Sequence, residues 1–152
     1  MDEIIQKLID RATKESKGIS VINSVDQLRE FYTDNVARYS EWRAIASIED
    51  WLPVDAEFLQ SFRKQLSING VHTKVIFKES GLKFERESLE KREVKVIPDS
   101  YRFRSSLDIL DDKILIMNPH QTILGLVLES RPFVDVFVDV FDVLWQSLPN
   151  RQ

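Results

Sequence analysis

The chain of 152 residues is long enough for one domain with its own hydrophobic core, without disulfides or a metal to hold it together. Hydrophobic residues make up 43% and charged residues 30%, with four glycines and five prolines, which excludes a long low-complexity linker. A formal net charge of -4, without a cluster of Lys and Arg, opposes contact with nucleic-acid phosphates, so this chain by itself is not expected to bind nucleic acid.

The residue types available also limit the chemistry. The chain has no Cys, which excludes thiol catalysis, disulfides and thiolate metal sites. Its two His have no neighbouring His or acid at ligand spacing, so neither a metal site nor a cofactor is expected. No apolar run is long enough to cross a membrane, and the N-terminus is acidic and amphipathic rather than a secretory signal. These features predict a cytoplasmic location without membrane association.

The first element is predicted to be an amphipathic helix that ends before Gly18. Its apolar positions recur at helical spacing and are Ile4, Ile5, Leu8, Ile9 and Ala12. We expect a boundary here, with residues 1–17 forming a connecting or dimerisation helix and residues 18–150 forming a single α/β domain.

Strands and helices then alternate along the first half of the domain. The expected order is a strand at 18–23, a helix at 25–39, a strand at 42–48, a helix at 56–66 and a strand at 71–77. Ser24 with Gln27 fits a capping box that opens the first of these helices. Pro53 suits the first turn of the second helix, and Asn69-Gly70 suits its end. Three β-α steps of this kind predict a largely parallel sheet.

The second half of the domain has a different pattern. After a short charged helix at 80–91, the expected strands are 93–97, 105–110, 113–117 and 122–129, with tight turns at 111–112 and 118–121. A final helix at 131–148 is preferred to a strand, because Asp135, Asp139 and Asp142 form one narrow polar stripe. The predicted fold is therefore an α/β domain whose mixed parallel and antiparallel sheet is covered by helices.

Four short motifs follow one another in this second half. They are a Pro-acid-x-Tyr loop, an acidic hairpin turn, a strand ending in Glu-Ser and a last helix ending near Leu-Trp. Their residues are Pro98, Asp99 and Tyr101; Asp111 and Asp112; Glu129 and Ser130; and Leu144 and Trp145. In this order they resemble the C-terminal effector domain of TrmB-like transcriptional regulators, and the resemblance covers nearly all of the chain. It implies a phospholipase D-like fold without the catalytic motif, ligand sensing and dimerisation, and a DNA-binding winged helix that this chain lacks.

The stretch HTKVIFKE, residues 72–79, is similar to the HxK(x)4D motif of phospholipase D-type phosphodiesterases, in which His attacks phosphorus and Lys stabilises the negative charge. In those enzymes the motif lies on a strand that follows a change in sheet direction. By position that strand is 106–110 here, which contains neither residue, and Glu79 replaces the Asp of the motif. We interpret this stretch as part of the strand at 71–77, with His72, Lys74 and Ile76 on one side. Phosphodiesterase activity that is lost on His72→Ala would favour the enzyme alternative.

Candidate ligand-binding residues are those that could hold a sugar or an anion. Tyr101, Arg102 and Arg104 lie in a loop between strands, where phenol and guanidinium groups form directional hydrogen bonds. Pairing with surface acids is their alternative use. Trp51 is predicted in a strand-to-helix loop of the kind that lines ligand crevices, with core packing as its alternative. We expect Ala at both Arg102 and Arg104 to abolish any stabilisation by ligand.

The whole pattern predicts an effector domain of a TrmB-like regulator rather than an enzyme. The alternatives are a phospholipase D-type phosphodiesterase that uses His72 and Lys74, and an assembly module without a ligand. We also predict a homodimer, because the apolar stripe of the first helix has no obligatory place on the sheet and the last helix is more apolar than one sheet face requires. Otherwise both helices would fold onto their own sheet and complete a monomer.

Overall fold

The computed structural model describes residues 2–8, 18–120 and 124–150. Residues 3–8 are helical, and the rest of the predicted first helix, 9–17, lies outside the described residues. The other elements are β1 (Ile19–Ile22), α2 (Val25–Asn35), β2 (Glu41–Ala46), α3 (Ile48–Ile68), β3 (His72–Lys78), the 3-10 helix η1 (Glu79–Phe84), β4 (Arg92–Ile97), β5 (Ser106–Ile109), β6 (Ile114–Met117), β7 (Gly125–Leu128) and α4 (Arg131–Ser147).

The strands form a single seven-stranded sheet in the order β1-β7-β6-β5-β2-β3-β4. Strands β2, β3 and β4 are parallel neighbours, whereas β2-β5, β5-β6, β6-β7 and β7-β1 are antiparallel pairs. The predicted mixed sheet is therefore confirmed. The parallel part is smaller than the three β-α steps indicate, because β1 lies at the far edge and pairs with the last strand instead of β2.

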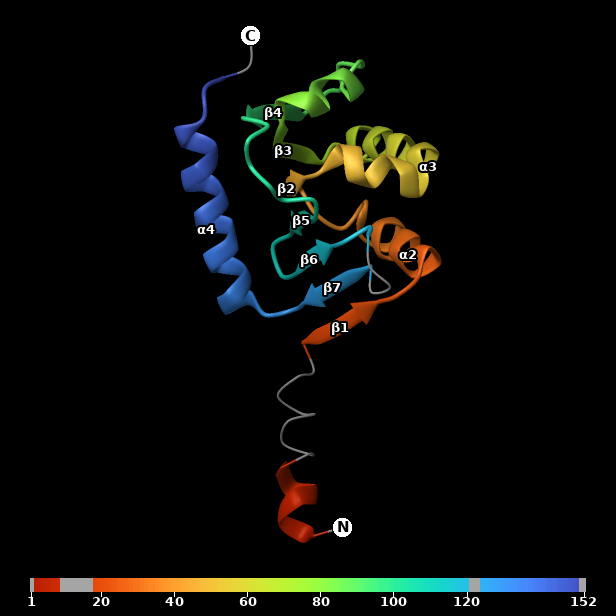
Figure 1. Ribbon diagram of the computed structural model, residues 1–152, viewed down its shortest axis with the longest axis vertical. Helices are drawn as coiled ribbons and strands as arrows, with labels where there is room; N and C mark the ends of the chain where they lie inside the picture. The colour runs from red at the N-terminus through yellow and green to blue at the C-terminus, as the bar shows by residue number, and fades with distance from the viewer. Residues whose placement is uncertain (1, 9–17, 121–123, 151–152) are drawn as a thin grey trace.

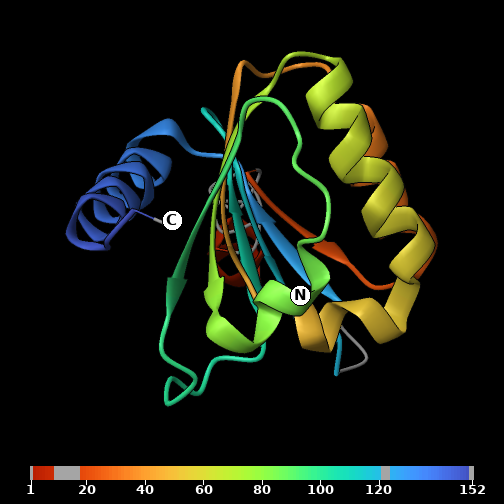
Figure 2. The same cartoon turned by 90° about the horizontal axis from the view of Figure 1, so that it is seen from above.

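The domain has three layers, with α2 and α3 on one face of the sheet and α4 on the other (Figures 1 and 2). The core under α2 and α3 contains Leu28, Trp42, Trp51 and Phe77, all buried. The core under α4 contains a second group, which is Ile76, Ile97, Ile109, Ile114, Val134, Phe141 and Trp145. Both faces of the central strands are thus apolar, as expected for strands with helices on either side.

The start of α2 follows its sequence signals. The backbone N–H of Gln27 donates to Oγ of Ser24 at 3.2 Å, and Oε1 of Gln27 accepts from the backbone N–H of Asn23 at 2.9 Å. Two donors at the helix start are therefore satisfied by the predicted pair of side chains. The tight turn before β6 is also confirmed, since the backbone N–H of Leu110 donates to the carbonyl of Lys113 at 2.9 Å.

Helix α3 begins eight residues earlier than the predicted 56, at Ile48. The predicted start corresponds to an internal kink, where Asp55 has non-helical backbone angles and its Oδ1 accepts from the backbone N–H of Phe58 at 3.1 Å. Asp55 thus caps the second part of α3, and about two further turns precede it. The predicted loop position of Trp51 is consequently wrong: this side chain lies in the first of these turns and is buried, 5% exposed.

The charged helix predicted at 80–91 is only partly formed, as η1 covers residues 79–84. Its continuation is prevented because the Glu85 side chain turns inward to bind Arg92 with Nε at 3.2 Å from both carboxylate oxygens, and Arg63 with Nη1 at 3.4 Å. If the helix continued to residue 91, the Glu85 carboxylate would lie on the helix surface instead. The contact therefore overrides the local helical pattern.

Helix α4 confirms the choice of helix over strand for 131–148. Its N-cap is Ser130, Pro132 lies in its first turn, and its Val134 and Phe141 are buried against the sheet. At the C-terminal end, Nζ of Lys95 donates to the carbonyls of Trp145 at 2.7 Å and Leu148 at 3.0 Å. A cation placed there interacts favourably with the negative end of the helix dipole.

The domain begins in close contact with β7. The carbonyl of Gly18 accepts from the backbone N–H of Glu129 at 2.6 Å, and a Cβ at position 18 would lie 2.4 Å from the carbonyl oxygen of Glu129. Glycine is therefore required here for the close approach of two backbones. Within the described residues, no helix has the length and apolar character that crossing a membrane demands.

Candidate functional site

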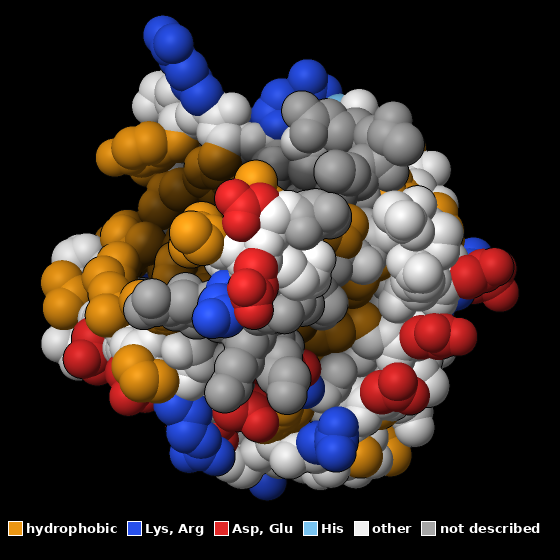
Figure 3. Space-filling model, turned by 90° about the horizontal axis from the view of Figure 1, so that it is seen from below, with side chains coloured by type: hydrophobic (Ala, Val, Ile, Leu, Met, Phe, Trp, Pro, Cys, Tyr) orange, Lys and Arg blue, Asp and Glu red, His pale blue; other side chains and the backbone are white. Residues whose placement is uncertain are grey.

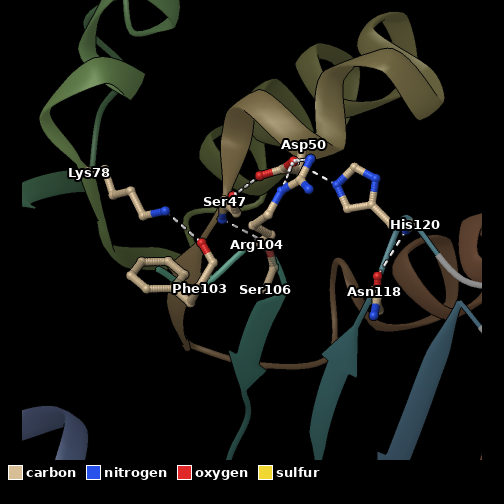
Figure 4. Close-up of polar contacts among 8 residues, drawn as sticks. All are labelled: Ser47, Asp50, Lys78, Phe103, Arg104, Ser106, Asn118 and His120. Atoms are coloured by element: carbon tan, nitrogen blue, oxygen red, sulfur yellow. Dashed lines mark hydrogen bonds and ion pairs between the residues drawn. The ribbon is translucent and has the colours of Figure 1, made fainter. Parts of the chain in front are cut away.

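Polar side chains converge at the edge of the sheet where β2 and β3 end and β5 begins. Asp50 lies in the first turn of α3, directly after β2, and Arg104 lies in the loop that leads into β5. His120 follows the end of β6, which is on the same edge because β6 is antiparallel to β5. Figure 4 shows these three side chains meeting one another. Open α/β sheets bind ligands at this edge, outside the carboxyl ends of the parallel strands.

The carboxylate of Asp50 is the centre of this cluster. Its Oδ1 accepts from Nε of Arg104 at 3.0 Å, from Nη2 of Arg104 at 2.8 Å and from Nε2 of His120 at 2.6 Å. Its Oδ2 accepts from the hydroxyl of Ser47 at 2.6 Å. Burial alone would raise the pKa of Asp50, but the hydrogen bonds from Ser47, His120 and Arg104 outweigh it and hold the pKa below its usual value. The cluster therefore holds an ionised acid against two basic side chains.

Neighbouring contacts fix the backbone around the cluster. The backbone N–H of Ser47 donates to Oγ of Ser106 at 2.9 Å, which joins the end of β2 to the start of β5. The backbone N–H of His120 donates to Oδ1 of Asn118 at 2.9 Å. On the side of β3, Nζ of Lys78 donates to the carbonyl of Phe103 at 2.6 Å and lies 4.7 Å from the centre of its ring. Each segment that carries the site is thus tied to its neighbour (Figure 4).

Of the four predicted ligand residues, only Arg104 is part of this cluster. Tyr101 and Arg102 occupy the same loop with exposed side chains, Tyr101 at 56%. Trp51 is next to Asp50 in the chain but is buried, where it lines a cavity of about 50 Å³ between α3 and the sheet together with Tyr32 and others. A space of that size holds a few water molecules.

Three members of the cluster, Ser47, Asp50 and His120, were not predicted as candidate site residues. Ser47 and Asp50 have the spacing of a helix start, Ser-x-x-acid, which was available as a signal in the sequence. The contact between His120 and Asp50 spans 70 positions in the chain, so no local pattern points to it.

The His72 and Lys74 pair lies elsewhere. His72 is the first residue of β3, at the opposite end from Lys78, and its Nε2 lies 2.6 Å from Oε2 of Glu93. Nζ of Lys74 lies 5.6 Å from the centre of the Trp145 ring, under α4. The predicted strand is present as β3, which covers residues 72–78, and Glu79 begins η1. No cluster of three or more potential metal-binding His, Asp or Glu side chains occurs in 2–8, 18–120 or 124–150.

The pH dependence of the stability should show whether the Asp50 carboxylate is hydrogen-bonded in the folded chain. A carboxyl group whose pKa is lower in the folded than in the unfolded chain stabilises the fold above the unfolded value, about 4, and this contribution disappears as the pH falls through the folded value. Asp50→Asn should therefore lower the unfolding free energy at pH 7 by about 1 kcal/mol, because the exposed Arg104 pair is screened by solvent, and should lose less stability on acidification than the wild type.

Urea unfolding at pH 7 and at steps between pH 5 and 2 measures this difference. Glu49→Gln is the matched control, since it makes the same chemical change on an exposed residue of the same turn. Parallel stability profiles for Asp50→Asn and the wild type would contradict the expected role of the carboxylate.

Comparisons with known proteins give the fold its context. No model of a known protein family matches the chain, and no curated protein matches it in sequence. The solved structure of TrmBL2, an archaeal chromatin protein with a novel mode of DNA binding, is similar with a TM-score of 0.65 at 12% identity. That similarity covers 98% of this chain and 63% of TrmBL2, so the chain spans less than two thirds of that protein.

Two further similar structures are members or relatives of the phospholipase D family. Nuc from Salmonella typhimurium, a phospholipase D family member, has a TM-score of 0.61 at 9% identity, with 88% of this chain and 97% of Nuc covered. NucT from Helicobacter pylori has a TM-score of 0.63 at 9% identity, with 88% and 98% covered. The predicted phospholipase D-like fold is thereby confirmed, and a link to TrmB-like proteins exists at the level of the fold.

Proposed function

We propose that the chain is the effector and dimerisation domain of a TrmB-like transcriptional regulator, and that it acts by binding rather than by catalysis. The observation that carries this proposal is the extent of the similarity to TrmBL2. At 98% coverage almost no residue of this chain is left unmatched by TrmBL2, whereas the similarity to Nuc and to NucT covers 88% of the chain.

The chemistry of the site supports a role without catalysis. On β5, the strand where the sheet changes direction, the polar side chains are Ser106 and Asp108 rather than His and Lys. Asp108 is buried and is bound by Tyr32 and Trp42, so it faces the core. The nucleophile and charge-stabilising groups that a phospholipase D-type reaction needs are absent from this strand, and His72 and Lys74 lie elsewhere. The phosphodiesterase remains the second candidate solely because of the fold.

The DNA contact in such a regulator would be made outside this domain. TrmBL2 binds DNA, but this chain has a formal net charge of -4 and no strongly basic segment. Phosphate contacts from Lys and Arg dominate the affinity of proteins for DNA. The contribution of this domain to such a regulator would be to hold two DNA-binding domains at a spacing that a bound ligand changes.

The Asp50 cluster is where a small polar ligand would bind. A carboxylate, a guanidinium and an imidazole that lie within one hydrogen-bonded group offer both acceptors and donors to the hydroxyls of a sugar, and the guanidinium offers a cationic partner to an anion. In a thermal-shift screen of sugars and small anions, Arg104→Ala should abolish the stabilisation that a binding compound gives the wild type. Arg102→Ala, an exposed residue of the same loop, should leave it unchanged. An unaltered response of Arg104→Ala would exclude this site.

Dimerisation is tested by sedimentation equilibrium at micromolar concentration. The wild type should have the mass of two chains, because Ile4, Ile5 and Leu8 are 49–68% exposed in the isolated chain and an apolar helix face of this kind needs a partner. Ile5→Glu with Leu8→Glu should have the mass of one chain and an unchanged circular dichroism spectrum. Ile68→Glu, an equally apolar and exposed position at the end of α3, should remain dimeric. A monomeric wild type would contradict the proposal.

A further inference from the structure

Two rows of side chains cross the face of the sheet that carries α4. The strand register places Arg43, Ile109, Ile114, Leu128 and Ile19 in the first row. It places Ile45, Leu107, Ile116, Leu126 and Val21 in the second row, nearer the site edge. The second row is entirely apolar across five strands. Because alternate residues of a strand face opposite sides, both rows project toward the same layer as α4.

Helix α4 covers the centre of the first row but leaves Ile19 at its edge 50% exposed, and it leaves three of the five residues of the second row open. In the first row Ile109 and Ile114 are each 1% exposed. In the second row exposure reaches 40% at Ile116, 41% at Leu126 and 51% at Val21. The sheet face over β6, β7 and β1 is therefore an uncovered apolar surface, although its counterpart over β2 and β5 is partly buried in the core under α4.

The flank of α4 beside this surface is also apolar. Phe133 and Val140, 61% and 62% exposed, lie on this flank, whereas Val136 and Val143 follow the buried Val134 and Phe141 by two residues and so face away from the sheet. The acids Asp135, Asp139 and Asp142 are on the other flank, where Nε of Arg43 in the first row donates to Oδ1 of Asp142 at 3.0 Å. The apolar flank consequently faces the second row. Helix and sheet together form an apolar groove, which Figure 3 shows as a recess lined by hydrophobic side chains.

We infer that this groove, defined by Val21, Ile116, Leu126, Phe133 and Val140, receives the N-terminal helix of a second copy of the chain. The inference rests on the proposed function, since it identifies where the dimer contact is made. The groove and its exposed rim amount to several hundred Å² of apolar surface, which monomeric proteins rarely leave open. The occupant must be apolar along one side and about as long as three strands are wide.

The segment at 3–8 meets both requirements. Ile4, Ile5 and Leu8 lie on one side of a helix, with Asp2 and Lys7 elsewhere on its surface. Six helical residues span about 9 Å, and three neighbouring strands span about 10 Å. In one chain both surfaces are exposed, so the helix does not fill the groove of its own domain. A reciprocal exchange between two copies buries both pairs of surfaces in one symmetric contact.

Cross-linking distinguishes a second copy from the chain's own helix. Because the chain has no Cys, single cysteines can be introduced without background. An affinity-tagged Leu8→Cys chain is mixed with an untagged Leu126→Cys chain and treated with a short bismaleimide. We expect a covalent heterodimer as the main product, and at least a tenfold lower yield when Ile68→Cys replaces Leu126→Cys. The double variant L8C/L126C should give covalently linked pairs of chains.

The outcomes separate this inference from the dimer itself. A wild type that sediments as a monomer overturns the proposed dimerisation and this contact with it. A dimer that gives no Leu8–Leu126 cross-link overturns only the groove contact, as does an L8C/L126C chain that is linked solely within itself. As a second readout, Leu126→Glu should weaken dimerisation at least tenfold and Ile68→Glu should not. An unaltered dimer of Leu126→Glu would equally rule the groove out.

Discussion

Replacing Glu85 by Ala should lower the unfolding free energy by about 3–5 kcal/mol, the largest effect expected of a single substitution in this domain. The Glu85 carboxylate lies between the guanidinium groups of Arg63 and Arg92, and these three side chains are only 5–11% exposed. Burial, together with the charge of Arg92, lowers the pKa of Arg63, and Glu85 is the charge that opposes this. Its removal would leave two cations close together with little access to water.

The matched control for this substitution is Glu87→Ala. Oε1 of Glu87 lies 3.6 Å from Nζ of Lys64, and both side chains are more than half exposed. The same change should therefore cost less than about 0.5 kcal/mol. Urea unfolding followed by circular dichroism measures both. Equal costs for the two variants would mean that Arg63 and Arg92 reach water when Glu85 is removed.

Replacing Asp108 by Ala should have the second largest effect and lower the unfolding free energy by about 2–5 kcal/mol. Oδ2 of Asp108 accepts from the hydroxyl of Tyr32 at 2.7 Å, and Oδ1 accepts from Nε1 of Trp42 at 2.9 Å. All three side chains are buried. Truncation would leave two buried donors without an acceptor, and each costs about 1–3 kcal/mol. Burial raises the pKa of Asp108, although the two hydrogen bonds act to lower it.

A comparable bond at the protein surface provides the control. Oδ1 of Asp112 accepts from the hydroxyl of Tyr39 at 2.7 Å, in a partly buried position. Asp112→Ala leaves only the Tyr39 hydroxyl without its acceptor, and this donor can turn to water. We therefore expect a loss of about 1 kcal/mol in the unfolding free energy. Asp108→Asn, which keeps one acceptor oxygen, should fall between the two Ala variants. A loss at Asp108→Ala no larger than at Asp112→Ala would show that water replaces the carboxylate in the core.

The elements that could be predicted are those whose signals lie within a few residues. The cap of α2 at Ser24, the turn before β6 and the helical stripe of α4 each depend on local spacing. The predictions fail where a residue that is distant in the sequence determines the local structure. Glu85 ends η1 because Arg92 and Arg63 bind it. The position of β1 at the sheet edge depends on pairing between Ile19 and Leu128, which are near opposite ends of the domain sequence.

The candidate site could likewise be predicted only where the signal is local in the sequence. Arg104 could be identified from its chemical type and its loop between two strands. Asp50 and His120 could not be joined from the sequence, because only the folding of β6 beside β5 brings position 120 to the start of α3. Trp51 was assigned to a loop since Pro53 suggested the first turn of a helix, whereas α3 begins earlier, at Ile48, and contains Pro53.

The contact at Gly18 determines how movement could pass into the domain. Its carbonyl is bonded to Glu129, the residue before the N-cap of α4, so the beginning of the domain and the beginning of α4 share one rigid joint. A torque applied through the N-terminal segment would be transmitted to this joint rather than absorbed by a pliable hinge at residue 18. From there α4 runs across the sheet to Lys95 on β4, at the opposite edge. In the proposed regulator, α4 would thus connect the start of the domain with the far edge of the sheet.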